Sequence, residues 1–587
     1  MNIIKKLLPL IIVIFLSLWA IKPLLHPGFF PIHDDEQVAR LYELTLAVNN
    51  GQIPPRWVPD LGFGYGFPLF NFYPPLVYYF GYLFHFVGFS FIDSTKIVMG
   101  LGFILSAFFM FIWVRKHYGV SAGLVAATLY TYVPYHAVDL YVRGASSEFF
   151  SFVWIPAVFW AFDRCSEKKT VLSALIAGVL LSFVVLTHNL VTLQFIPFLA
   201  VYLLYLLYKE RKSFIKKVFL LFSLSGLISL GISAYFWLPS LLEKKYTLVD
   251  KILLGELANY KLHFVCPWQF FNSPWGYGGS IAGCVDGLSF QIGKVQIAVS
   301  LLAILLIIFS ILFKRKLTFS LKLPFVIFFF LLFSLFMATS YSQPIWNIFQ
   351  PLAYIQFPWR FLLFTAVFTA FLGGFVTAVL KRYLNKYLFL LVCAIFGVGL
   401  IYSVRLDFSP LSYLSVNDSF YVSKQDLQWR VSGMSYEYVP KGVATKLSDI
   451  GTTVLDISKQ DIPKKSYEVL KGDMNIHEVI NLPQYKKYTV TVNKPGSIRI
   501  NTYSFPGWTL IVDGVKVDYN DMNKLKLITF NLPIGKHNVE VLFENTLIRT
   551  IGDYITVSTL LFVLLFVLYY KVYKSKYLLN IKRKYGK

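Results

Sequence analysis

The sequence Leu7-Leu-Pro-Leu-Ile-Ile-Val-Ile-Phe-Leu-Ser-Leu-Trp-Ala-Ile-Lys-Pro-Leu-Leu25 decides the class of fold. This run is almost wholly apolar, and it has the length that a helix needs to cross a hydrocarbon core of about 30 Å. Similar runs recur at 96–114, 120–138, 149–163, 170–187, 190–208, 218–238, 295–313, 323–340, 361–380, 387–404 and 552–570. Together they predict a polytopic α-helical membrane protein with about twelve spans.

The composition of the whole chain agrees with this class. Of the 587 residues, 56% are hydrophobic, 18% aromatic and only 15% charged, and the mean hydropathy is +0.59. Soluble domains are about 45–50% apolar and about 25% charged. A soluble or disordered chain is therefore excluded, and 4 cysteines are too few for a disulfide scaffold. The net charge of +24 is placed mainly in loops that orient the spans, so no nucleic-acid partner is expected.

The apolar segment 75–91 determines the topology. It begins with two prolines and contains His85 and two glycines, so we expect it to lie along the outer interface or to re-enter the membrane without crossing. The basic loops then all fall on the cytoplasmic side, as the positive-inside rule requires. These loops are 5–6, 115–116, 164–169, 209–217, 314–322, 381–386 and 571–587.

This topology predicts a plasma-membrane protein with both termini in the cytoplasm and an uncleaved first span, because no small-residue cleavage site follows it. Four long segments then lie outside: 26–94, 239–294, 341–360 and 405–553. The spans carry few ionisable residues, which argues against a coupled transporter. Cys266 and Cys284 share one outer loop, where an oxidising compartment would allow a disulfide.

Residues 405–551 differ in composition from the rest and predict an extracytoplasmic β-sandwich-like domain. Alternating or β-branched runs occur at 488–492, 497–500, 508–512, 527–531 and 538–543, separated by Pro495-Gly496, Pro506-Gly507 and Asp513-Gly514. We therefore divide the chain into a transmembrane domain at 1–404, with the catalytic outer loop 26–94 inside it, this β-rich domain at 405–551, and a last helix with a basic tail at 552–587.

The first outer loop begins Phe30-Pro-Ile-His-Asp-Asp-Glu-Gln-Val-Ala-Arg40. Three consecutive acids at a membrane surface repel one another unless a cation lies among them, and one carboxylate could then serve as a general base. The structural alternative is that Asp34 caps a helix running from Glu36 to Asn49. The loop continues through Pro55-Arg56-Trp57 and a Gly-aromatic stretch at 60–75, which predicts a compact aromatic turn.

Further polar residues return to the same outer face. The third span ends in Asp139-Leu-Tyr-Val-Arg143-Gly-Ala-Ser-Ser-Glu148, and His188 lies in a short turn between spans. Arg360, in Gln356-Phe-Pro-Trp-Arg360, breaks the positive-inside pattern. Its planar guanidinium could bind a phosphate through two hydrogen bonds, or it could only extend to the interface.

These motifs resemble the GT-C glycosyltransferase superfamily, and more closely its branch named after a 6-pyruvoyl-tetrahydropterin-synthase-related membrane domain. The resemblance covers about residues 1–400. It rests on His33-Asp34, Pro55-Arg56-Trp57, Gly64-Tyr65-Gly66-x-Pro68-x-Phe70-x-x-Tyr73-Pro74-Pro75, Arg143-Gly144 with Glu148, and Phe357-Pro358-Trp359-Arg360.

The resemblance implies an inverting transferase that takes a sugar from a polyprenyl-phosphate donor to an acceptor of the cell envelope. It implies Asp34 or Asp35 as the base, Glu148 as a second acid, and Arg360 as the residue that holds the lipid phosphate. A divalent cation, Mg²⁺ or Mn²⁺, is one option that the resemblance leaves open, with Asp34, Asp35 or Glu148 as its ligands; a transferase without a cofactor is the other, because the paired acidic motif of the metal-dependent members is not clearly reproduced. The remaining substrate-binding candidates are His33, Arg56, Trp57, Tyr65, Tyr73, Arg143 and His188.

Two alternatives remain open at the level of sequence. One is a lipid or glycan transporter with twelve spans, which predicts polar residues in mid-membrane. The other is a non-catalytic scaffold for envelope assembly that uses the β domain to bind a glycan or a partner. The sugar and the acceptor are not specified by any motif.

Overall fold

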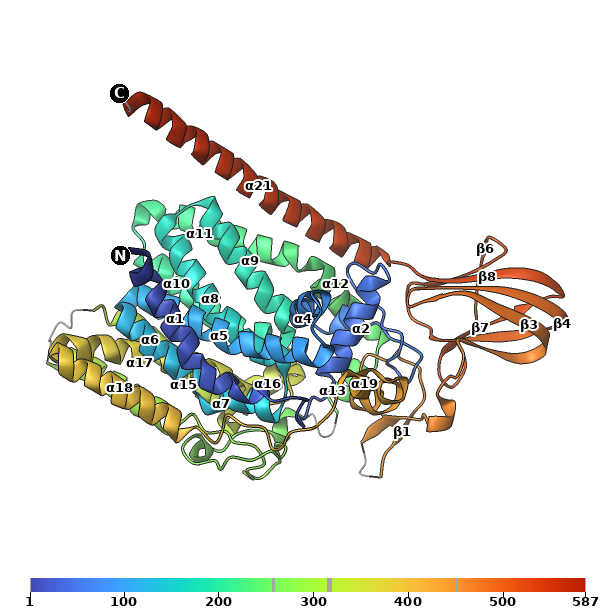
Figure 1. The fold of residues 1–587 in the computed structure, drawn as a ribbon, viewed down its shortest axis with the longest axis horizontal. Coiled ribbons are helices and arrows are strands. Elements are labelled where there is room, and N and C mark those ends of the chain that lie inside the picture. Colours follow the sequence, from blue (N-terminus) through green and yellow to red (C-terminus); the bar gives the residue numbers. More distant parts are fainter. Residues whose placement is uncertain (1, 256–258, 314–318, 450–451, 586–587) are drawn as a thin grey trace.

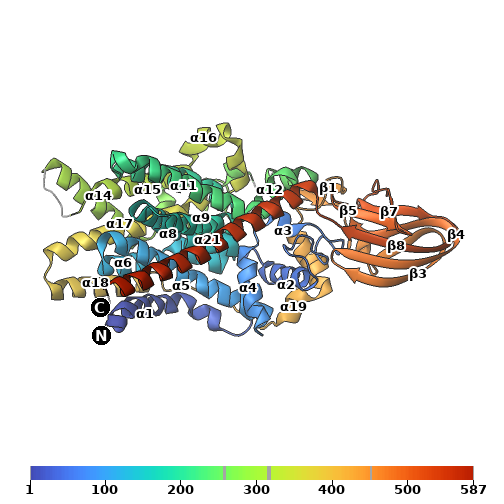
Figure 2. The same cartoon turned by 90° about the horizontal axis from the view of Figure 1, so that it is seen from above.

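A computed structural model describes residues 2–255, 259–313, 319–449 and 452–585. A body of helices fills one end of the molecule, and a β domain extends from the other end (Figure 1). The last helix, α21, runs from the β domain back past the helical body. Both termini consequently lie at the end of the body opposite the β domain (Figure 2).

The helical body contains a helix at each of the twelve segments predicted to span. Their bounds are α1 Asn2–Ile21, α5 Phe91–Tyr118, α6 Val120–Thr131, α8 Ser146–Lys168, α9 Val171–Thr187, α10 Asn189–Lys209, α11 Lys212–Ile232, α14 Lys294–Leu312, α15 Lys322–Ala338, α17 Leu362–Tyr383, α18 Lys386–Ser403 and α21 Leu547–Tyr585. Short helices connect them: α2 Gln37–Asn49, α3 Leu69–Phe72, α4 Leu76–Phe86, α7 Pro134–Ala137, α12 Ala234–Leu242, α13 Val249–Leu253, α16 Gln343–Ile348, α19 Asp418–Val422 and α20 Ser432–Met434.

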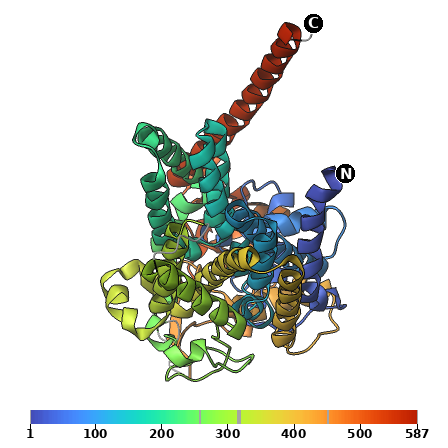
Figure 3. The same cartoon turned by 90° about the vertical axis from the view of Figure 1, so that its left-hand side faces the viewer.

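Within the described residues, eight helices are long and apolar enough to cross a membrane, and α6, α9 and α15 are shorter apolar helices. The chain is therefore a multi-pass membrane protein, while the count of twelve spans stays a prediction. The body is built around α17, which is buried along its whole apolar length and packs against α6, α14 and α15. In contrast, only 11% of the apolar part of α18 or of α21 is buried, and Figure 3 shows α21 leaving the body.

Helix α4 bears on whether the segment 75–91 crosses the membrane. It covers only 11 residues of the segment 75–91, which is about 16 Å of helix and too short for a hydrocarbon core of about 30 Å. This agrees with the expectation that the segment does not cross. Of the basic loops used in that argument, residues 314–318 and 586–587 lie outside the described residues, and so do the side chains of 5–6 and 573–585.

The β domain consists of one six-stranded antiparallel sheet and a separate hairpin. The strands of the sheet are β3 Tyr467–Leu482, β4 Tyr485–Tyr503, β5 Trp508–Val512, β6 Val515–Val517, β7 Leu527–Leu532 and β8 Gly535–Phe543, and the hairpin joins β1 Thr445–Leu447 to β2 Thr453–Leu455. The first half of β4 pairs with β8 and the second half with β7. The predicted β domain is therefore present, and strands β3 to β8 form one continuous sheet in which β4 changes partner from β8 to β7. The sandwich-like packing stays a prediction.

Two turn predictions in this domain have different outcomes. Asp513 and Gly514 have φ values of 51° and 81° and connect β5 to β6, as predicted for a tight hairpin. Pro495-Gly496, in contrast, lies inside β4 and not in a turn. A Cβ atom at Gly496 would stand 1.8 Å from the carbonyl oxygen of Lys471, so glycine permits a close approach of two strands there.

The Gly-aromatic stretch of the first outer loop connects the two parts of the molecule. Phe63, Tyr65, Phe67 and their neighbours share one buried core with the inner face of the β sheet. Gly66 has a φ of 72°, and a Cβ there would lie 2.5 Å from the indole nitrogen of Trp57. We call this region, residues 53–73 with the adjoining β sheet and the start of α21, the joint.

The second outer loop is closed by a disulfide between Cys266 and Cys284. The other two cysteines, Cys165 and Cys393, are free. A disulfide forms and persists in an oxidising compartment.

Candidate functional site

The polar motifs of the helical body meet at the end that faces the β domain. Here a π-helical turn, Val138–Val142, interrupts the chain between α7 and α8. Such turns often occur at functional sites, since the extra residue turns side chains out of the regular helical register. This turn carries Asp139 and is followed at once by Arg143.

The loop that holds the three acids is fixed to this turn by its backbone. The amide of His33 donates to the carbonyl oxygen of Val142 over 3.1 Å, and the amide of Asp34 to that of Arg143 over 2.8 Å. Gly144, with a φ of 66°, makes the approach possible, because a Cβ atom there would lie 2.3 Å from Cδ1 of Ile32. The backbone of Asp34 is therefore held directly beside Arg143.

Glu148, in the first turn of α8, is the centre of a buried ionic network. Its Oε2 accepts hydrogen bonds from Nη1 of Arg143 over 2.8 Å and from Nε of Arg360 over 2.9 Å. Its Oε1 accepts from the hydroxyl of Tyr135 over 2.6 Å. Asp139 forms a further ion pair with Arg143. We call Asp139, Arg143, Glu148 and Arg360 the charged cluster.

In this cluster the carboxyl groups of Asp139 and Glu148 face the guanidinium groups of Arg143 and Arg360. Glu148 and Asp139 are fully buried, and burial of an unpaired charge would be very costly. Arg143 also lies over the ring of Trp359, 4.5 Å from its centroid. The sequence therefore brings Arg143, Glu148 and Arg360 together although they are up to 217 residues apart.

Some polar groups around the cluster are not used by it. Across the described residues, the carboxylate of half-buried Asp34 accepts no hydrogen bond, although it interacts electrostatically with Arg143 and Asp139. Arg360 uses Nε for Glu148 and Nη1 for the carbonyl oxygen of Ile355 at 2.7 Å, which leaves its Nη2 group available. The site thus offers a carboxylate acceptor beside guanidinium donors.

His188 borders the same cluster. Its ring caps α10 by accepting a hydrogen bond from the amide of Val191 over 3.2 Å. Burial lowers the pKa of His188 to about 3, and the positive charge of Arg360 acts in the same direction. The imidazole is therefore neutral at physiological pH and does not add a third positive charge.

The two neighbouring aspartates are in different environments. Asp35 accepts hydrogen bonds from Nη1 of Arg430 over 2.7 Å and from the hydroxyl of Tyr421 over 3.1 Å. Burial raises the pKa of Asp35 to about 6, against the lowering effect of Arg430. Arg430 lies in the π-helical turn Asp426–Val431, which follows α19. This turn belongs to residues 404–444, which connect α18 to the β hairpin and which we call the linker. Sequence reasoning missed Arg430, because its partner lies 395 residues away.

The helix after these acids is not capped by Asp34, so the structural alternative for that residue is wrong. Helix α2 begins at Gln37, one residue later than expected, and its N-cap residue Glu36 makes no side-chain capping bond. Glu36 pairs instead with Arg40 over 2.9 Å. Burial raises the pKa of Glu36 to about 7. Tyr73 lies under the Arg40 guanidinium, 3.9 Å from ring centroid to Cζ, on the border of the site.

Four other sequence candidates make contacts away from the charged cluster. Arg56 pairs with Asp553 at the start of α21 over 2.6 Å, and the Trp57 ring meets Trp508 edge to face. The hydroxyl of Tyr65 donates to the carbonyl oxygen of Asp461. These three residues belong to the joint. His33 is bound through Nε2 to the carbonyl oxygen of Tyr277 in the second outer loop, at 2.9 Å.

The predicted divalent cation does not fit the side chains as they are arranged. Among the described residues, no group of three or more His, Cys, Asp or Glu side chains is placed to hold a metal ion. Glu148 accepts three hydrogen bonds and Asp35 two, so within the described residues Asp34 is the one predicted ligand whose carboxylate accepts none. A role for Mg²⁺ or Mn²⁺ stays a prediction.

The fold and the site define an integral membrane protein with a buried ionic cluster at one end of its helical body. No protein-family model matches the chain. A protein of Lactococcus lactis subsp. cremoris (strain MG1363), described as uncharacterized, is 27% identical over 239 residues, which is 39% of each chain. The chain thus matches about two fifths of the length of this curated relative.

One solved structure is similar over a larger part of the chain. It is the Archaeoglobus fulgidus oligosaccharyltransferase in the apo form, with a TM-score of 0.40 and 14% sequence identity. The match covers 74% of this chain and 60% of that one.

Proposed function

We propose that the chain is a membrane glycosyltransferase that moves a sugar from a polyprenyl-phosphate donor to an acceptor of the cell envelope. The observation that carries the proposal is the position of Asp34: among the described residues its carboxylate makes no ion pair or hydrogen bond, and its backbone is fixed beside Arg143, which shares Glu148 with Arg360. The motif resemblance to GT-C glycosyltransferases, and to their branch named after a 6-pyruvoyl-tetrahydropterin-synthase-related membrane domain, supports the same reaction.

Asp34 is the proposed general base. The acceptor hydroxyl gives its proton to the Asp34 carboxylate while its oxygen attacks C1 of the donor sugar. A new C1–O bond forms on the face opposite the leaving group, so the configuration at C1 is inverted. Asp35 is less suited to this role, since Arg430 and Tyr421 already occupy its oxygens. A base in such a position typically contributes about 10²–10⁴-fold to the rate.

Arg360 and Arg143 are the proposed phosphate-binding residues. The bond between C1 and the phosphate oxygen breaks with its electron pair on that oxygen, so negative charge develops on the leaving polyprenyl phosphate. Guanidinium donors held in place before the reaction stabilise that charge without reorganising. Glu148 touches neither proposed reacting atom. It is a positioning residue that holds both guanidinium groups at 2.8–2.9 Å.

The architecture supports a lipid-linked donor at the outer face of the plasma membrane. A polyprenyl chain can stay in the bilayer between the apolar helices. The phosphate of this lipid then reaches the charged cluster, which lies at the ends of the helices. The disulfide between Cys266 and Cys284 supports an oxidising compartment on that side. Both termini lie at the opposite end of the body, which supports their location in the cytoplasm (Figure 2).

The experiment compares envelope glycans in cells with and without the gene. A deletion strain is complemented with the wild type or with the double variant Asp34→Asn, Asp35→Asn at matched protein levels, and the sugar composition of the envelope is measured. We expect one sugar to disappear on deletion and to return only with the wild type; that sugar then identifies the donor. Full restoration by the double variant would instead support the scaffold or the transporter.

A further inference from the structure

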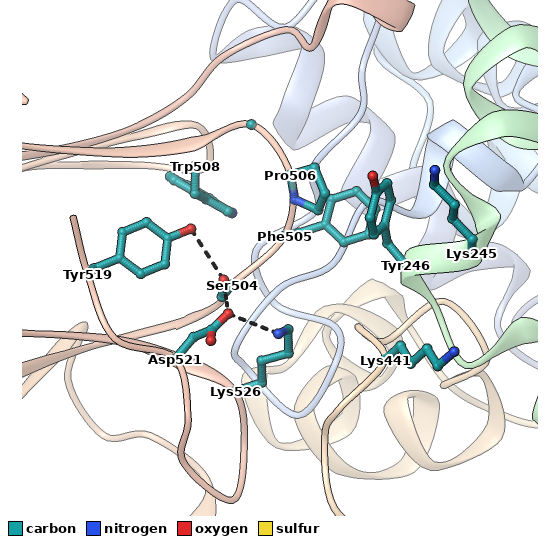
Figure 4. A pocket seen from close by; sticks show the side chains of 11 residues that line it. Lys245, Tyr246, Lys441, Ser504, Phe505, Pro506, Trp508, Tyr519, Asp521 and Lys526 are labelled. Carbon is teal, nitrogen blue, oxygen red and sulfur yellow. Dashed lines mark hydrogen bonds and ion pairs between the residues drawn. The ribbon is translucent and has the colours of Figure 1, made fainter. Parts of the chain in front are cut away.

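A cavity lies away from the charged cluster, where the β domain meets the second outer loop and the linker. Its volume is about 390 Å³, and three separate parts of the chain line it (Figure 4). Lys245 and Tyr246 come from the second outer loop, Lys441 from the linker, and Trp508, Tyr519 and Lys526 from the β domain. Ligand pockets commonly measure about 300–1,000 Å³.

The positive charge of this cavity is only partly compensated. Lys526 pairs with Asp521 over 2.9 Å, and Asp521 also accepts a hydrogen bond from the hydroxyl of Ser504 over 2.8 Å. Across the described residues, no carboxylate pairs with the side chain of Lys245 or of Lys441. Neither ammonium group is neutralised by a carboxylate in the described part of the chain, although Nζ of Lys245 lies 5.1 Å from the centroid of the Tyr246 ring. Cations without a carboxylate partner favour an anionic ligand.

Aromatic side chains supply the other half of the wall. Tyr246 is 40% exposed; Phe505 meets it edge to face at 6.3 Å between ring centroids, and Nζ of Lys245 lies over the ring at 5.1 Å from the centroid. The hydroxyl of Tyr519 lies 3.2 Å from that of Ser504 and can form a further hydrogen bond. The apolar C–H face of a pyranose can pack against an aromatic ring, while the hydroxyl groups at the edge of the sugar form hydrogen bonds with protein hydroxyl and ammonium groups. A recessed wall of this kind fits a sugar better than it fits the flat surface of a bilayer.

The cavity is rigidly connected to the rest of the molecule. The amide of Lys441 donates to the carbonyl oxygen of Tyr246 over 2.7 Å, which joins the linker to the outer loop. Arg549 of α21 donates to the carbonyl oxygen of Pro506, also in the wall, over 2.8 Å. Lys441 follows Arg430 by eleven residues, so the cavity lies within about 40 Å of the linker residue that binds Asp35.

We infer that this cavity binds an anionic saccharide, a glycan that carries carboxylate or phosphate groups. If the chain is the proposed glycosyltransferase, the bound glycan is the acceptor: the cavity holds one part of the glycan while another part reaches Asp34. Only this assignment of the acceptor rests on the proposed function. The cavity then determines which acceptor is used, and the charged cluster performs the transfer.

The test measures binding to the purified full-length chain in detergent, without any donor. The probes are trigalacturonic acid, which carries one carboxylate per sugar, the neutral trisaccharide maltotriose, and inorganic phosphate. The variants are the double substitution Lys245→Gln, Lys441→Gln and the single substitution Tyr246→Ala. Lys516→Gln is the matched control, because Lys516 is an exposed lysine of β6 outside the cavity.

We expect wild type to bind trigalacturonic acid more tightly than maltotriose or phosphate, and the double variant to lose about tenfold in affinity. Tyr246→Ala should weaken binding of both trisaccharides, and Lys516→Gln should change neither. The inference is overturned if wild type binds neither trisaccharide, if the double variant binds as wild type does, if phosphate alone binds as tightly, or if vesicles of anionic phospholipid displace the probe at equal charge concentration.

The same measurement separates this inference from the proposed function. Asp34→Asn lies outside the cavity and should bind trigalacturonic acid as wild type does. If Asp34→Asn keeps full transferase activity while the lysine variants lose binding, the proposed base is wrong and the saccharide site stands. If Asp34→Asn loses activity and the lysine variants bind normally, the reverse holds.

Discussion

The charged cluster and the joint both bury arginines against carboxylates, yet they differ in what they leave unused. In the joint, every guanidinium nitrogen of Arg549 donates, to Glu243 over 2.9 Å and to the carbonyl oxygens of Glu544 and Pro506. In the charged cluster, among the described residues, Nη2 of Arg360 donates to no acceptor, and the carboxylate of Asp34, whose backbone lies beside Arg143, pairs with no cation. A buried ion pair alone therefore does not indicate a reactive site; donors and acceptors that remain available do.

The largest effect is expected from removing the acid of each region in turn. Glu148→Gln leaves Arg143 and Arg360 without their shared carboxylate, and Glu243→Gln does the same to Arg549. Breaking a buried ion pair typically costs about 3–5 kcal/mol, so both variants should unfold more easily in denaturant. Only Glu148→Gln should also lose transferase activity per folded molecule. Equal activity losses in both variants would remove the distinction between the two regions.

A pH dependence of stability is expected from Asp35. Its pKa is about 6 in the folded chain against an ordinary 3.8, so the folded state binds its proton more tightly. Protonation of Asp35 therefore stabilises the folded state by about 3 kcal/mol at most. This stabilisation is fully present below about pH 4 and is lost as the pH rises through about 6. Thermal unfolding of wild type between pH 4 and 7 should show it.

Asp35→Asn is the control for this titration, since asparagine resembles the neutral carboxyl. The variant should lose this part of the pH dependence and keep the rest. Unfolding curves of wild type and Asp35→Asn that shift in parallel across the whole range would contradict the assignment.

A smaller effect is expected from Gly144→Ala. The added Cβ would lie 2.3 Å from Ile32, so it displaces the loop that holds Asp34. Overpacking and the positive φ together cost about 1–3 kcal/mol, and activity should fall with the displacement of Asp34. Gly119→Ala is matched to it, with a φ of 86° and no atom within 4 Å of the new Cβ. Gly119→Ala should keep its activity, and an equal loss would show that loop position is irrelevant.

The smallest effect concerns the guanidinium group itself. Arg360→Lys keeps the charge but loses the planar pair of donors, so KM for the lipid-linked donor should rise about tenfold. Arg56→Lys makes the equivalent change in the joint, where Asp553 and Asn71 use the guanidinium. Steady-state kinetics should show no change of KM in Arg56→Lys; a rise in both variants would place donor binding in the joint as well.

Local pattern predicts the elements of this fold better than it predicts their partners. Hydropathy locates a helix at each of the twelve segments, and strands β5, β7 and β8 lie where alternation predicts them. Strand β3 escapes prediction because most of its side chains are exposed, so it has no apolar face to signal it. The Pro495-Gly496 pair predicts a turn but lies inside β4, because the sequence around a glycine does not show that another strand approaches it closely.

The candidate site shows the same limit. Arg143 and Glu148 are near in sequence, and Asp139 precedes Arg143 by one helical turn, so their proximity could be anticipated. Trp57 and Tyr65 have the same local character as residues of a binding site, but their partners Trp508 and Asp461 lie some 400 residues away. The choice between Asp34 and Asp35 likewise depends on Arg430, which only the fold brings into contact.

The most direct measurement is the transfer rate of purified Asp34→Asn beside that of Asp35→Asn. Release of polyprenyl phosphate is followed with a polyprenyl-phosphate sugar and the acceptor extracted from the envelope, and thermal unfolding confirms that both variants are folded. The account predicts a loss of about 10²–10⁴-fold for Asp34→Asn and a much smaller loss for Asp35→Asn. Full activity of folded Asp34→Asn would contradict the account.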